Sequence, residues 1–201
     1  MCNQKRAREF FRLGEQYTET ALLLLDTLVN NGNSNAGFGK SAEEARQDME
    51  RNTSKSDMYL FVPAIFACLQ STELYIKGLL LLNGETFEWG HGTEQLLHDL
   101  MISYGENSEI FFTIKNLCEK QIRIIESYRE TNRITESKDL YMSLRYPEIR
   151  LSTENGKKNV AIDYTDLFCN GDIGIEQFKV LLTSLKVVKL AVIKEYHSKT
   201  N

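Results

Sequence analysis

Residues 66–84 read FACLQSTELYIKGLLLLNG, an apolar run that is crossed by Gln70, Glu73 and Lys77. Because these polar residues are three or four positions apart, they share one face of a helix with Phe66. The other faces are filled by branched aliphatic side chains, so little of this helix can be exposed to solvent. The stretch therefore predicts the central helix of an all-α fold, with a polar stripe running along it.

The polar stripe has two interpretations. As a thin solvent-facing edge, it would contain an i,i+4 pair of Glu73 and Lys77 worth about 0.2–0.5 kcal/mol. As the lining of a crevice or a dimer seam, it would bury Glu73, whose charge would then need a partner. Lys77 and His98 are both candidates for that partner. The second interpretation predicts a pocket.

Apolar residues recur at helical spacing through most of the remaining chain. Ser41 with Glu44 forms a capping-box pattern, Thr93 and Ser108 are N-cap candidates, and Gly105 is a helix stop. Alternating apolar residues on both sides of Asn155-Gly156 indicate a hairpin. We expect helices at about 4–30, 41–52, 57–82, 93–105, 108–130, 135–144 and 174–197, with Pro63 starting the third near Leu60 or kinking it.

Together these elements predict an up-and-down helical bundle of four to five long helices, with a small β-hairpin or ordered loop near 148–163. A chain of 201 residues is long enough for one domain with its own core. We expect a single helical domain over 1–201, a flexible or inserted segment at about 30–56, and a loop or hairpin insertion at about 145–172.

Composition narrows the functional classes. The formal net charge of −4 excludes a bulk basic field for nucleic acid, although local basic patches remain open. The four cysteines form no CxxC pair, and two of them lie in apolar helical patterns, which favours buried free thiols. No signal peptide is evident and the leucine runs at 22–25 and 79–82 are far shorter than a membrane span, so we expect a cytoplasmic protein without membrane contact.

Catalytic motifs are absent from the sequence. It contains no GxGxxG, GxxxxGK[ST], GxSxG or HExxH pattern, and no Glu-x-x-His pair for a di-metal centre. We therefore expect neither a cofactor nor a metal ion.

Several short motifs resemble the HEPN superfamily. They are Ala67 or Cys68 ahead of Glu73 and Lys77, then Gly84, then a Leu-His-Asp-Leu segment at 97–100. The later Arg-Tyr-Pro at 145–147 is similar to a segment of bacterial HEPN proteins. The resemblance covers mainly residues 57–104.

The resemblance implies a helical bundle that usually forms a homodimer. Many HEPN proteins are ribonucleases of defence and toxin–antitoxin systems, and others partner nucleotidyltransferases or bind nucleotides. The ribonuclease branch carries an Arg four to six residues before a His, and none of His91, His98 and His197 has one. That chemistry needs a base near the 2′-hydroxyl and a cation for the phosphate, so we expect no ribonuclease activity.

The leading hypothesis is a homodimeric, non-catalytic binding or regulatory module for a nucleotide or RNA, in a bacterial defence or toxin–antitoxin type context. Glu73 would orient Lys77 or His98, with Asp99 beside them, while Arg145 and Lys77 hold anionic oxygen and Tyr146 stacks on a base. Wide apolar faces on the fourth and last helices favour self-association, and a partner protein encoded nearby would fit the same context. The candidate ligand-binding residues are Glu73, Lys77, His98, Asp99, Arg145 and Tyr146.

Two alternatives remain open. In the first, the protein is a divergent ribonuclease in which His98 is the base and Arg145 is a phosphate clamp brought from a distance. In the second, it is a purely structural interaction domain whose polar stripe only fixes the helix register.

Overall fold

The computed structural model of the protein describes residues 2–31, 40–51, 58–87, 92–153, 156–164 and 175–200. The insertions expected at about 30–56 and 145–172 lie partly outside these residues. The described elements are α1 (Cys2–Asn31), α2 (Ala42–Arg51), α3 (Met58–Leu82), α4 (Thr93–Tyr104), α5 (Glu109–Thr131), α6 (Ser137–Ser143), β1 (Glu148–Thr153), β2 (Gly156–Ala161) and α8 (Ile175–Thr200).

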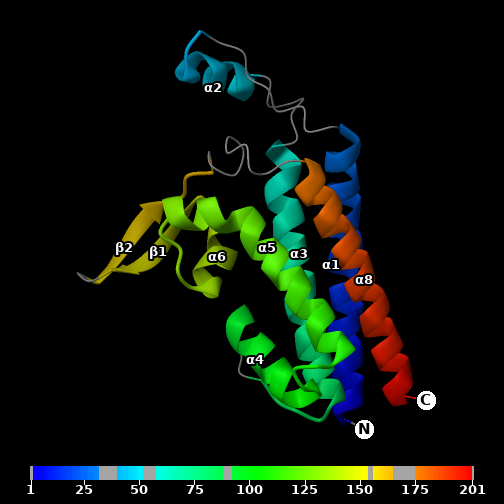
Figure 1. Ribbon diagram of the computed structural model, residues 1–201. Coiled ribbons are helices and arrows are strands. Elements are labelled where there is room, and N and C mark those ends of the chain that lie inside the picture. Colours follow the sequence, from blue (N-terminus) through cyan, green and yellow to red (C-terminus); the bar gives the residue numbers. More distant parts are fainter. Residues whose placement is uncertain are drawn as a thin grey trace.

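Helices α1, α3, α5 and α8 lie side by side and alternate in direction, as the colours in Figure 1 show. The predicted all-α, up-and-down bundle is therefore confirmed. Helix α3 is the centre of the fold, because it contacts α1, α4, α5 and α8. Neighbours on several sides explain why residues 71–82 are buried without interruption.

Helix α3 is also long and apolar enough to cross a membrane by length and composition, over Leu60–Leu82. It is the one such helix in the described part of the chain. Within its apolar window, 83% is buried inside the protein. The core helix of a helical bundle meets the same criteria of length and composition.

Two of the predicted helix ends are confirmed and one is wrong. The Ser108 hydroxyl accepts a hydrogen bond from the Phe111 backbone N–H at 3.3 Å, and α5 begins at the next residue. Gly105 ends α4 with φ 85°, a conformation that favours glycine. Thr93 is not a cap, because α4 already includes it and is preceded by Gly92, which makes no side-chain capping bond.

The capping box of α2 is present in a shifted form. Ser41 Oγ accepts from the Glu44 backbone N–H at 3.2 Å, as the pattern predicts. The Glu44 carboxylate accepts from the backbone N–H of Lys40 at 2.8 Å, one residue earlier than the box requires. At the start of α3, Pro63 lies inside the helix, which begins at Met58 rather than near Leu60.

The predicted hairpin is confirmed. Strands β1 and β2 pair antiparallel, with Arg150 opposite Asn159 and Thr153 opposite Gly156. Gly156 has φ 105°, which explains the glycine at the start of the returning strand. Ile149 and Leu151 are buried on the inner face of β1, so the hairpin is anchored to the bundle and its other face is free.

Cys68 and Cys118 are free, buried thiols, as the sequence predicts for cysteines in apolar helical patterns. Burial raises the pKa of Cys118 to about 12 and raises the pKa of Cys68 further still. Both sulfurs therefore stay protonated near neutral pH and are poor nucleophiles. Cys68 on α3 and Cys118 on α5 both lie in the hydrophobic core.

Candidate functional site

The polar stripe of α3 faces inward. Lys77 Nζ donates to Glu73 Oε1 at 2.5 Å, and the two side chains are 6% and 2% exposed. The solvent-edge interpretation of these two residues is therefore excluded. A buried pair needs close geometry and further hydrogen bonds to offset the desolvation of both charges.

Tyr141 of α6 lies beside this pair. Its hydroxyl donates to the Leu69 carbonyl at 2.9 Å, which ties α6 to α3. Burial raises the pKa of Tyr141 well above its ordinary value, and the charge of Glu73 and a hydrogen bond to it raise the pKa further. Tyr141 therefore acts as a neutral donor next to a carboxylate.

Sequence reasoning missed Tyr141, although the residue carried a usable signal. A tyrosine in an apolar position of a short helix must bring a partner for its hydroxyl when it is buried. Here the partner is on a helix 72 residues away in sequence, so the pattern around residue 141 could not identify it.

Arg145 and Tyr146 follow the end of α6, and the structure brings them to the stripe. The Arg145 guanidinium carbon lies 5.9 Å from the Phe66 ring centroid and 5.4 Å from that of Tyr146. Phe66 opens the polar stripe of α3 and packs edge-on against Tyr141 at 6.3 Å between ring centroids. The Arg145 region therefore adjoins the buried pair through two aromatic side chains.

Arg145 is exposed and holds its charge without a counter-charge. Among the described residues, no carboxylate lies within ion-pair distance of its guanidinium. Contacts with two rings restrict the guanidinium through cation–π attraction but leave its N–H donors unused by acids. Such a group can bind an anionic oxygen, and Tyr146, 43% exposed, offers a ring beside it.

His98 and Asp99 lie on α4, and the structure does not bring them to Glu73. Leu96 and Leu100 turn one face of α4 to the core, so His98, two residues after Leu96, points the other way. The His98 side chain is 57% exposed and its Nδ1 lies 3.9 Å from Asp99 Oδ1. Lys77 and Tyr141 lie beside the buried Glu73, while His98 faces solvent.

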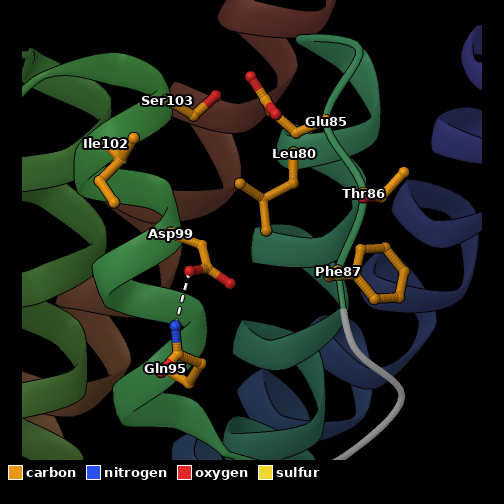
Figure 2. A pocket seen from close by; sticks show the side chains of 8 residues that line it. All are labelled: Leu80, Glu85, Thr86, Phe87, Gln95, Asp99, Ile102 and Ser103. Carbon is orange, nitrogen blue, oxygen red and sulfur yellow. Dashed lines mark hydrogen bonds between the residues drawn. The ribbon is translucent and has the colours of Figure 1, made fainter.

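Asp99 lines a separate cavity of about 510 Å³ between the end of α3, the chain that follows it and α4. Figure 2 shows Asp99 reaching from α4 toward α3, with Glu85 and Ser103 at the other end of the same hollow. Lys77 lies near this region as well, since its Nζ is 5.4 Å from the ring centroid of Phe87. The lining residues are Leu80, Glu85, Thr86, Phe87, Gln95, Asp99, Ile102 and Ser103.

The described part of the chain offers no set of side chains that could hold a metal ion. Within the described ranges, no group of three or more His, Cys, Asp or Glu side chains is placed to hold a metal ion. What the arrangement can do is bind: the Arg145 region offers a cation and an aromatic ring, and the Asp99 cavity offers carboxylates.

Comparison with known proteins gives one match. The family model described as HEPN domain matches residues 39–165, which is more than half of the chain and includes α3 to β2. No curated protein and no solved structure matches this sequence. The matched segment contains all six candidate residues.

Proposed function

The chain belongs to the HEPN family, and on that basis we propose that it is a non-catalytic binding module for a nucleotide or an RNA strand. The proposal includes a homodimer that acts in a bacterial defence or toxin–antitoxin type context, with which the family is often linked. The ligand would contact the surface formed by Phe66, Arg145 and Tyr146, called here the Arg145 surface.

The observation that supports binding is the unpaired, aromatic-held guanidinium of Arg145. An exposed arginine usually finds a nearby carboxylate or moves freely in water. Here two rings hold it, Nη2 donates to the Tyr146 hydroxyl at 3.5 Å, and no acid of the described residues occupies its other donors, which suits a phosphate oxygen. A base can stack on the exposed Tyr146 ring at the same time, and stacking tolerates any base sequence.

The sequence and the position of His98 together support a non-catalytic role. No Arg precedes a His at the spacing of the ribonuclease motif. His98 is on α4, whereas Arg145 follows α6 and contacts α3. A base and a phosphate clamp for one reaction would need to meet at a single phosphodiester.

Substituting Arg145 by alanine is expected to weaken RNA binding about tenfold or more, because a hydrogen bond to a charged group contributes about 1.5–3 kcal/mol. Tyr146→Ala should weaken it by a similar factor through lost stacking. Fluorescence anisotropy with a labelled, mixed-sequence single-stranded RNA measures both. Arg123→Ala, which removes an exposed arginine from α5, is the matched control and should bind as wild type.

Three results would contradict this function. RNA cleavage by the wild-type protein that disappears in His98→Ala would establish the ribonuclease alternative. Equal RNA affinity for wild type and Arg145→Ala would remove the Arg145 surface as the binding site, and no binding of any nucleotide would leave the structural interaction domain.

The homodimer is supported by an apolar strip on α8. Val187, Leu190 and Ile193 are 50%, 67% and 38% exposed, although they stand on a helix whose opposite face packs in the core. A second copy of the chain would cover them.

We expect Leu190→Glu to convert a dimer to a monomer in sedimentation velocity, whereas Leu23→Glu, at an equally exposed leucine of α1, should not. A wild-type protein that is monomeric at micromolar concentration would contradict the proposal.

A further inference from the structure

The cavity lined by Asp99 is a second feature with the dimensions of a ligand site. Its volume of about 510 Å³ falls in the range of small-molecule pockets, roughly 300–1,000 Å³. It lies between α4 and the end of α3, and it shares no lining residue with the Arg145 surface. Any ligand it takes is therefore separate from the one proposed above.

In the described part of the chain, the ionisable groups that line this cavity are both acids. Glu85 stands on the chain leaving α3, and Asp99 reaches in from α4 (Figure 2). Among the described residues, neither carboxylate has a lysine or arginine within ion-pair distance. Two carboxylates that line one hollow favour a positively charged occupant.

Polar groups near the cavity orient Asp99 and engage the ammonium of Lys199. Gln95 Nε2 donates to Asp99 Oδ1 at 2.8 Å, which orients the carboxylate and leaves Oδ2 available. The Lys199 ammonium is engaged by Asn83 Oδ1 and lies 3.8 Å from Glu195 Oε1, and Asn83 in turn donates to Ser103. His98 is a further titratable neighbour of Asp99, with its Nδ1 3.9 Å from Asp99 Oδ1.

The walls of the cavity are partly apolar. Leu80 is fully buried at the α3 side, while Ile102 on α4 is 69% exposed. A ligand whose hydrocarbon covers the exposed Ile102 side chain would gain binding free energy, because apolar surface is removed from water. Thr86 and Ser103 add hydroxyl groups that can accept hydrogen bonds from a cation.

From this arrangement we infer that the cavity binds a small organic cation, an ammonium or guanidinium group carried on a short hydrocarbon. The charged group lies in the field of Glu85 and Asp99, and the hydrocarbon covers Ile102. Inorganic cations would leave the apolar wall exposed, and anions would meet two carboxylates.

The test compares two probes of nearly equal shape, 2-phenylethylammonium and neutral 2-phenylethanol, at pH 8 on the full chain. Titration is followed by ¹H–¹⁵N correlation NMR, which reports the affinity and the place of binding. The ammonium is expected to bind in the millimolar range and to shift the amides of residues 95–103. The alcohol should bind at least fivefold more weakly, since it lacks the charge.

The variant Glu85→Gln/Asp99→Asn should lose at least tenfold in affinity for the ammonium. Glu106→Gln, at an exposed acid that does not line the cavity, and Arg145→Ala should both bind as wild type. Thermal melting of each variant checks the fold. Equal affinity for ammonium and alcohol, unchanged affinity in the double variant, shifts outside this region, or no shift at tens of millimolar ammonium would each overturn the inference.

Discussion

Replacing Glu73 by alanine is expected to lower the free energy of unfolding by about 3–5 kcal/mol, the range for breaking a buried ion pair from one side. The Lys77 side chain is only 5–6% exposed, so its ammonium cannot reach bulk water without moving the helices around it. It would keep the ring of Phe87 but lose its carboxylate at 2.5 Å. Against a total stability of about 5–15 kcal/mol, the loss should be plain in urea denaturation.

Companion variants separate charge from packing. Glu73→Gln keeps the shape of the side chain and removes only its charge, so it should cost less than alanine and more than nothing. The double variant Glu73→Leu/Lys77→Met removes both charges and should recover most of the loss, because apolar replacements of buried pairs are often neutral. If Glu73→Ala unfolds at the wild-type urea midpoint, the carboxylate is not buried in solution.

Leu79→Ala is expected to cost about 3–5 kcal/mol, in the upper part of the range for a buried leucine. Leu79 has no exposed surface and sits in the middle of the core cluster. Collapse around the missing methyl groups is restricted, because α3 is held by α1, α4, α5 and α8 at once. A neighbour that moved toward the gap would leave its other contacts.

The matched control for this substitution is Leu23→Ala on α1. Leu23 is 69% exposed, so the same chemical change removes little buried area and should alter stability by less than about 0.5 kcal/mol. Both variants are measured by urea denaturation with the slope checked for constancy. Equal losses at the two leucines would contradict the central position of α3.

The fold could be predicted from the sequence because each helix carries its own information. Apolar spacing defined the long helices, and the glycine at 156 marked the hairpin because only a positive φ fits there. Ser108 was identified because a side-chain oxygen before a helix has one obvious use. The same rule wrongly predicted Thr93 as an N-cap, because α4 already includes Thr93 and Gly92 precedes it. The ends of a helix depend on the neighbouring structure as well as on residue preference.

The candidate site could be predicted only in part. Burial of Glu73 and Lys77 was one of two interpretations that the sequence left open, whereas their pairing followed from the four-residue spacing. The rotation of α4, which turns His98 outward, depends on how Leu96 and Leu100 meet α3, and neither residue is unusual in sequence. The approach of Arg145 to Phe66 spans 79 residues, and no local pattern encodes such a contact.

The position of α3 in the chain also bears on how the protein is made. Ribosomal synthesis delivers this apolar segment after α1 and the polar α2, while α4, α5 and α8 are still to come. Until α8 is released, the side of α3 that packs on it is uncovered, and nascent chains with exposed apolar surface are prone to aggregate. Truncation ahead of residue 175 would make the hazard permanent, so fragments of this protein should accumulate as aggregates where the whole chain does not.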